Sequence, residues 1–447
     1  MKMRKIVAAV LVLLLLCFAA AGQAASLKDV LKFLQAGDPV SFRIQVEAGK
    51  LPQFGEKRTG QLNLLLKHLE ITGAVEAQES AAAFLLDGKR LFTAIEWTEP
   101  DGRRISALDT GTGKQYILSS EKSDDTASTG IDALLRNRDI FLSLDAYAAF
   151  FRELPNAFPD KAGTVKVGEK YRDYGNAVRK VNLVLNAEDL TGYITGNAAK
   201  YGKLYPDPAG FVFEGKQSFS LYFTAEDVLI RITYSGRCGT GSDDLRSVRL
   251  EWKTLRSEKA DRDEIVLRTP NSQGTKRNNF LLKHVRKAGE DGAETFSWDT
   301  EIDRVAGGVR TRLFSAASLD MKDCRLNGTL TERISSQGRE STAEARPDFT
   351  VQEDGRYSGT LEIIHKKDKI ETDRWSFAAE LAPKDPSQAA EEAADTVTLS
   401  EDGAADLIRR ISAEIVRSLL SLPSEDLLFL ADGLPEGVLE EIAGLIK

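Results

Sequence analysis

One short run in the sequence carries the residue types of a known acid–base site. Asp109-Thr110-Gly111 matches the triplet that aspartic proteases place on a loop, where two carboxylates share one proton. That chemistry needs two copies of the triplet, and this chain has one. The following Thr112-Gly113 pair is typical of a hairpin turn, so we expect a turn here.

Two other patterns lack the partners that their chemistry needs. Ser119 and Lys122 fit the Ser-x-x-Lys pattern of penicillin-interacting serine enzymes, but neither a Ser-x-Asn element nor a Lys-Thr-Gly triplet follows, and we expect a charged surface loop. His68, His284 and His365 stand far apart, and no pair has the spacing of a zinc site. We find no phosphate-binding loop, dinucleotide fingerprint or calcium loop, and predict no catalytic residue, metal or cofactor.

The first residues read as an export signal. A basic start, Met1–Lys5, precedes the apolar run Ile6–Ala21, which is shorter than the roughly 20 residues of a membrane span. Small residues then favour cleavage after Ala24 or Ala25, with acylation of Cys17 as the alternative. We therefore predict a secreted or cell-envelope protein, outside the cytoplasmic membrane, that does not span a membrane after cleavage.

Cleavage removes three positive charges and no negative one, so the formal net charge of -8 becomes -11. Nucleic acid is a poor partner for such a chain. Two cysteines remain, Cys238 and Cys324, and an exported chain permits one disulfide between them. Two separate buried thiols are the alternative.

The elements that would position any site are mainly strands. From Phe211 to Thr269 apolar residues alternate with polar ones, restarting after each turn, as expected for an antiparallel meander with one buried face. Asp87-Gly88 between apolar runs predicts a type I′ hairpin. About fourteen strands follow along the chain.

Helices accompany this sheet. Leu62, Leu65, Leu66 and Leu69 form an amphipathic stripe, and residues 131–137 and 145–154 read as two short helices. We predict an α+β fold: a large curved antiparallel β-sheet, a half-barrel-like meander, with helices on its concave face and a helical C-terminal tail. The predicted parts are a signal peptide at 1–25, the sheet domain at 26–383, and a linker and tail at 384–447. In the tail, the residues expected to pack together are Leu407, Ile411, Ile415 and Leu419.

A group of short motifs resembles uncharacterised secreted proteins of Gram-positive bacteria, a likeness that implies no known activity. These motifs are Gly236–Gly239, Leu245–Val248, Glu251-Trp252, Arg262–Glu264 and Arg277–Asn279. Separately, the long meander with helices on one face resembles the half-barrels of lipoprotein carriers (LolA-like).

These patterns lead to a functional hypothesis. We expect a non-catalytic envelope protein that binds an apolar or lipid-like molecule on the concave face of its sheet. The residues expected to line that face are Phe219, Leu221, Phe223, Ile230, Ile232 and Trp252. The alternatives are a structural or adhesive surface protein with a closed core, and a hydrolase with an unrecognised site. The oligomeric state cannot be read from these patterns.

Overall fold

The architecture is that of a computed structural model. The residues that it describes are 40–52, 55–75, 79–98, 103–109, 114–122, 130–197, 200, 210–239, 245–257, 259–269, 276–289, 293–306, 309–352, 356–383, 395–398 and 424–426. The predicted signal peptide, Cys17 and the four apolar tail residues lie outside the described residues.

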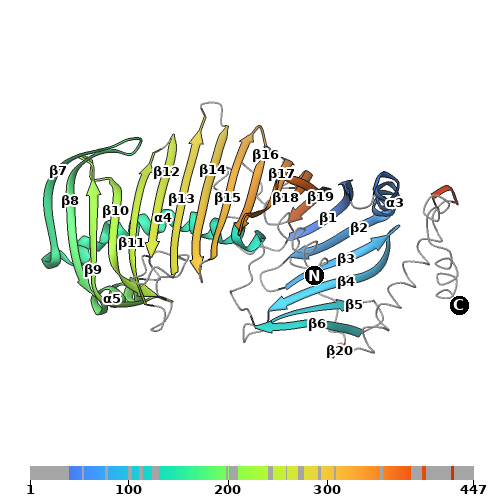
Figure 1. Ribbon diagram of the computed structural model, residues 1–447, viewed down its shortest axis with the longest axis horizontal. Helices are drawn as coiled ribbons and strands as arrows, with labels where there is room; N and C mark the ends of the chain where they lie inside the picture. Colours follow the sequence, from blue (N-terminus) through green and yellow to red (C-terminus); the bar gives the residue numbers. More distant parts are fainter. Residues whose placement is uncertain are drawn as a thin grey trace. The chain divides into compact units, whose positions relative to one another are not determined.

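The chain divides into two compact units. The first comprises residues 1–128, 346–365 and 371–447, and the second comprises 129–345 and 366–370. Strand β17 (Arg339–Val351) contains the boundary between them. Each unit is built mainly from antiparallel strands (Figure 1).

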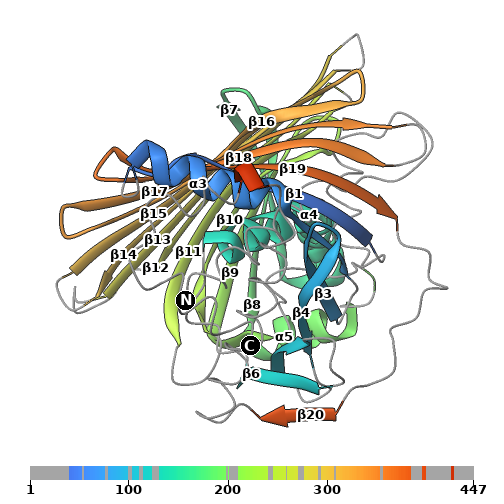
Figure 2. The ribbon, with the colours of Figure 1, turned by 90° about the vertical axis from the view of Figure 1, so that its right-hand side faces the viewer.

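The second unit is a meander in which each strand pairs with the next along the chain. Its strands are β7 (Ala162–Tyr171), β8 (Gly175–Asn186), β9 (Val212–Phe223), β10 (Leu229–Gly239), β11 (Arg246–Arg256), β12 (Ala260–Thr269), β13 (Lys276–Ala288), β14 (Glu294–Ala306), β15 (Val309–Lys322) and β16 (Arg325–Ser336). Figure 2 looks along this row and shows the strands fanning out, as the normal twist of a sheet requires.

The first unit follows the same antiparallel pattern, with helix α3 (Gly55–His68) between its first two strands. Its strands are β1 (Val40–Lys50), β2 (Leu69–Val75), β3 (Glu79–Leu86), β4 (Lys89–Thr98), β5 (Arg103–Asp109), β6 (Lys114–Lys122), β18 (Tyr357–Lys367), β19 (Ile370–Pro383) and β20 (Asp395–Thr398). Strand β20 pairs with β6 in parallel.

The predicted turn at Asp87-Gly88 is confirmed. Both residues have positive φ, 51° and 74°, as a type I′ turn requires, and they join β3 to β4. Gln337-Gly338 repeats this geometry between β16 and β17. Turn chemistry therefore fixed the hairpins in both units.

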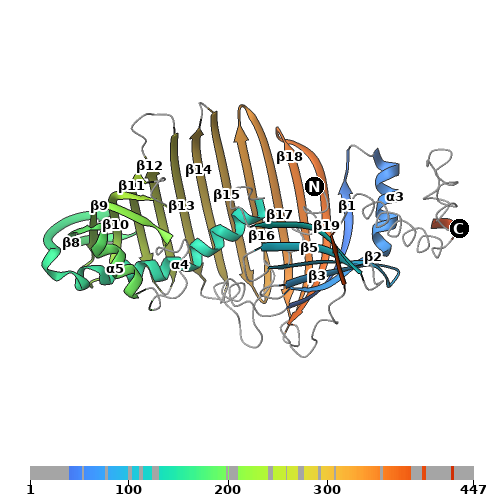
Figure 3. The ribbon, with the colours of Figure 1, turned by 90° about the horizontal axis from the view of Figure 1, so that it is seen from below.

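Two helices of the second unit lie against one face of its sheet. Helix α4 (Gly130–Ala157) runs across the row of strands in Figures 1 and 3, and α5 (Ala187–Asn197) packs beside β8 and β9. The α4 side chains Leu144 and Phe151 pack with Leu221 and Trp252 of the sheet. We call this helix-facing side the covered face and the opposite side the wet face.

Several sequence-based expectations need correction. The fold is mainly β rather than α+β, and the described residues form 20 strands instead of about fourteen. The two short helices expected at 131–137 and 145–154 belong to the single helix α4. The charged loop expected at Ser119–Lys122 belongs to strand β6. Within the described part of the chain, no helix has the length and apolar character to cross a membrane.

The predicted disulfide is not formed, because Cys238 and Cys324 are both free. Cys238 lies on β10, whereas Cys324 lies in the turn between β15 and β16. Five strand steps separate β10 from β15, which at normal spacing is roughly 24 Å. A disulfide needs Cα atoms within about 7 Å. Both cysteines lie near the ends of strands, but these strands are not adjacent in the sheet, so the two residues are far apart.

Helix α4 should contribute strongly to stability through Leu154, which is fully buried against Phe150 and Leu183. We expect Leu154→Ala to lower the free energy of unfolding by about 2–5 kcal/mol, through lost burial and the cavity left behind. Ile370→Ala, at a 72% exposed position, should change it by less than about 0.5 kcal/mol. Denaturant titration of both variants measures the difference, and equal effects would contradict the packing of α4.

Candidate functional site

Buried polar side chains gather on the covered face of the second unit. Seven polar or charged side chains are buried in the described part of the chain, and six of them lie on six consecutive strands, β11 to β16. We call this set the polar lane: Thr254, Asp263, His284, Thr300, Ser315 and Glu332. Its members alternate with apolar core residues on the same strands, so they belong to the core-facing side of the sheet.

Strand register places the lane in two adjoining rows. Thr254 pairs with Asp263, which pairs with His284 on the next strand. The second row is displaced by two residues along the strands. It runs from Thr300 through Ser315 to Glu332. Directly opposed side chains in antiparallel strands lie about 5 Å apart, so each row is continuous.

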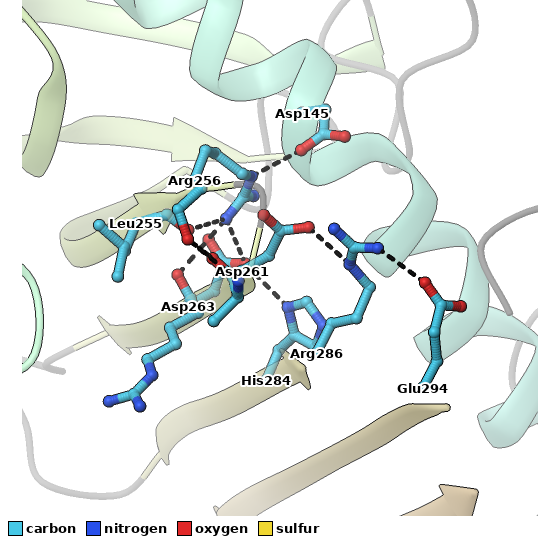
Figure 4. A network of polar contacts seen from close by, with 11 residues as sticks. Asp145, Leu255, Arg256, Asp261, Asp263, His284, Arg286 and Glu294 are labelled. Atoms are coloured by element: carbon cyan, nitrogen blue, oxygen red, sulfur yellow. Dashed lines mark hydrogen bonds and ion pairs between the residues drawn. The ribbon is translucent and has the colours of Figure 1, made fainter. Parts of the chain in front are cut away.

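Asp263 is the centre of the first row, and its side chain is fully buried. Its carboxylate accepts hydrogen bonds from Trp252 Nε1 at 2.8 Å, Arg256 Nη1 at 2.9 Å and His284 Nδ1 at 3.0 Å. A buried charge is tolerated when it is paired and hydrogen-bonded in this way. Figure 4 shows Arg256 and His284 converging on the Asp263 carboxylate.

The pKa values of this pair follow from burial and from their mutual contact. Burial by itself would raise the pKa of Asp263, but the His284 hydrogen bond and the Arg256 charge outweigh it, and the pKa is lowered. Burial lowers the pKa of His284 and outweighs the opposing effect of Asp263. At neutral pH the pair is therefore a carboxylate holding a neutral imidazole through its Nδ1–H.

Arg256 ties this centre to helix α4. Its Nε donates to Asp145 Oδ1 at 2.6 Å while its Nη1 reaches Asp263, so one guanidinium joins helix and sheet (Figure 4). Asp145 is 49% exposed, so its ion pair lies at the solvent boundary. The polar lane thus meets water beside the helix.

A second cation stands at the same ends of the strands. Arg286 donates to Asp261 at 2.9 Å and to Glu294 at 3.0 Å. These side chains are mostly buried, with 12 to 18% exposure. We call Arg256, Asp261, Arg286 and Glu294 the rim network, because they lie near strand ends between the lane and solvent.

Two hydroxyl groups of the lane have no hydrogen-bond partner within the described residues. They are Thr254 Oγ1 and Ser315 Oγ, on side chains only 2% and 1% exposed. Buried hydroxyls are normally paired with protein or water. These two can accept or donate a hydrogen bond.

The residues predicted to line an apolar ligand site lie in the core. Five of them, Phe219, Leu221, Phe223, Ile232 and Trp252, belong to clusters that α4 residues fill. The sixth, Ile230, packs instead with Ala177 and Tyr222. An irregularity in the β9–β10 register at this point explains the difference, since a bulge redirects a side chain.

Sequence reasoning did not find the polar lane. In the sequence, His284 was assessed only as a possible zinc ligand together with His68 and His365. Asp263 was noted only as part of the motif Arg262–Glu264. The available signal was polar residues at core-facing positions, as in Trp252-x-Thr254 and Leu282-x-His284. Asp109, from the protease-like triplet, ends β5 in the other unit.

Comparison with known proteins gives no family for this chain. No protein-family model matches, and no curated protein matches. Among solved structures, an outer membrane protein of Vibrio cholerae (OmpT, trimer form) is 7% identical, with a TM-score of 0.27, over 77% of this chain and 97% of that one. The carbohydrate-binding β-barrel Wzi of Escherichia coli is 6% identical, with a TM-score of 0.29, over 82% and 90%. A porin is 10% identical, with a TM-score of 0.28, over 77% and 98%.

These findings correct the predicted resemblances. The similar structures are outer-membrane and porin proteins, not secreted Gram-positive proteins or LolA-like carriers, and neither predicted likeness is retained. These similar structures do not support the expected apolar or lipid-like ligand, or the expectation of a protein that does not span a membrane, and neither expectation is retained. At TM-scores below 0.3 no function is carried across.

The Asp263–His284 pair predicts lower stability in acid. Because folding lowers the pKa of His284, the unfolded chain binds more protons below its ordinary pKa of about 6.5, and stability falls as pH drops through that value. The lowered pKa of Asp263 adds a loss at more acidic pH, below about 3.9. Denaturant titrations from neutral to mildly acidic pH should show a shallower decline in His284→Asn than in the wild type. Parallel curves would contradict this assignment.

Proposed function

We propose that this protein acts in the cell envelope by binding a small polar solute, with the polar lane beneath helix α4 as the binding site. The observation that carries the proposal is the pair of buried hydroxyls, on Thr254 and Ser315, without a partner in the described residues. A bound solute would supply the missing hydrogen bonds.

The energetic argument favours a ligand over an accidental polar core. Burying a hydroxyl without a hydrogen bond costs about 1–3 kcal/mol. A valine side chain has nearly the same shape as that of Thr254, and an alanine would fit at Ser315. Apolar residues could therefore occupy both positions without disturbing the packing. The retention of hydroxyls at Thr254 and Ser315 is better explained by a polar partner that they contact.

The geometry limits the size of the solute. Four strand steps separate Thr254 on β11 from Ser315 on β15, roughly 19 Å at normal spacing. One small molecule cannot reach both hydroxyls. Ser315 is the better anchor for a small solute, because its direct neighbours across the sheet are the buried Thr300 and Glu332.

The proposal can be tested with three four-carbon probes of different charge: putrescine, 1,4-butanediol and succinate. We expect at least one probe to raise the melting temperature of the mature protein in a saturable way, because a ligand that binds only the folded state stabilises it. The Ser315→Ala variant should lose most of this shift.

Ser318→Ala is the matched control, since Ser318 lies on the same strand but is exposed on the wet face. It should keep the full shift. If no probe binds the wild type, or if both serine variants respond as the wild type does, the lane holds ordered water only and the proposed function is wrong.

A further inference from the structure

We infer that His68 holds residues 424–426, near the C-terminus, against helix α3 when its imidazole is protonated, and that it releases them when the imidazole is neutral. Two contacts of one ring support this, one with Asp87 and one with Asp426. A third observation is that the ring nitrogen facing Asp426 is buried without a hydrogen-bond partner in the described part of the chain. All three residues belong to the first unit, so none of them is part of the proposed binding site.

The His68 ring lies between two carboxylates from different parts of the chain. His68 ends α3, and its Nδ1 is 2.8 Å from Asp87 Oδ1 in the turn between β3 and β4. The Asp87 backbone N–H also donates to the His68 carbonyl oxygen at 3.0 Å. On the other side of the ring, Nε2 is 3.7 Å from Asp426 Oδ2. The turn therefore fixes the ring, and the ring faces Asp426.

The protonation state of the ring decides whether both carboxylates can be satisfied. A carboxylate only accepts hydrogen bonds, and a neutral imidazole has a single N–H. The contact with Asp87 uses that N–H at Nδ1, which leaves a lone pair on Nε2 facing the Asp426 oxygen. This explains why Nε2 is buried yet has no hydrogen-bond partner among the described residues. An imidazolium has an N–H on both nitrogens, so only the protonated ring can donate to both carboxylates.

The charges that contact the ring favour its protonated form. They are the carboxylates of Asp87, from the β3–β4 turn, and Asp426, from the C-terminal residues. Lys67, Lys89 and Glu425 are near these residues in the sequence, but their side chains are exposed. Histidine is the side chain whose charge ordinarily changes between pH 5 and 8. The contact with Asp426 should therefore form at the acidic end of that range and weaken at its alkaline end.

Spin labels can follow this attachment. We would introduce Glu56→Cys on α3 and Ser424→Cys, both at exposed positions, in a chain whose native cysteines are replaced by serine. Pulsed electron paramagnetic resonance then measures the distribution of distances between the two labels. We expect one narrow distribution at pH 5.5 and its loss to a broad distribution at pH 8, because the ion pair holds the second label in place only while the imidazole is charged.

Two substitutions within residues 424–426 provide a matched pair. Asp426→Asn removes the carboxylate that faces the ring, so we expect a broad distribution at both pH values. Glu425→Gln removes a carboxylate from the same segment, but this side chain is exposed, and the variant should respond to pH as the labelled parent does. His68→Gln, which cannot be protonated, should give the broad distribution at both pH values.

The inference is overturned if the labelled parent gives the same distribution at pH 5.5 and pH 8. It is also overturned if Glu425→Gln loses the narrow distribution as Asp426→Asn does, because a general loss of charge would then explain the effect. Should His68→Gln fold poorly, Asp426→Asn still decides, since the Asp426 side chain is 31% exposed and its replacement leaves no buried gap.

Discussion

The buried carboxylate of Asp263 is the constraint on which the centre of the second unit depends. Its side chain is fully buried, and three donors from strands β11 and β13 compensate its charge. Removing any one donor would leave a partly uncompensated buried charge, which typically destabilises more than an intact pair stabilises. Register between these strands is therefore specified by charge as well as by the apolar pattern. The same carboxylate connects to α4 through Arg256.

The covered face of the sheet has two chemically different parts. Around β8 to β11, α4 and α5 close an apolar core with rings such as Phe150 and Phe219. Farther along, from β11 to β16, each strand contributes one polar lane residue to that face. The first part resembles any helix-on-sheet core. In the second part, the burial of Asp263 is compensated by the hydrogen bonds that it accepts from Trp252, Arg256 and His284.

Local pattern predicted much of the fold and little of the site. Alternation identified strands β9 to β11, and Asp87-Gly88 identified a hairpin, because each of these signals is contained within a few consecutive residues. The lane depends on register across strands distant in sequence, and the pair Asp145–Arg256 spans 111 residues. No local pattern reports such contacts. The same limit explains why the disulfide prediction failed. Cys238 and Cys324 both lie near strand ends, but on strands that are not neighbours in the sheet.

The wet face shows why the polar lane cannot be explained by general polarity of the sheet. Charged side chains there pair across neighbouring strands at the surface, as Lys253 does with Glu264 at 3.3 Å, and such pairs contribute little to stability. A sheet that needs solubility places its charges on that side. Asp263 and Glu332 lie on the other side, where each carries a desolvation cost that the surface pairs avoid. The need for solubility therefore explains the charges on the wet face, but it does not explain the buried charges of Asp263 and Glu332 on the covered face.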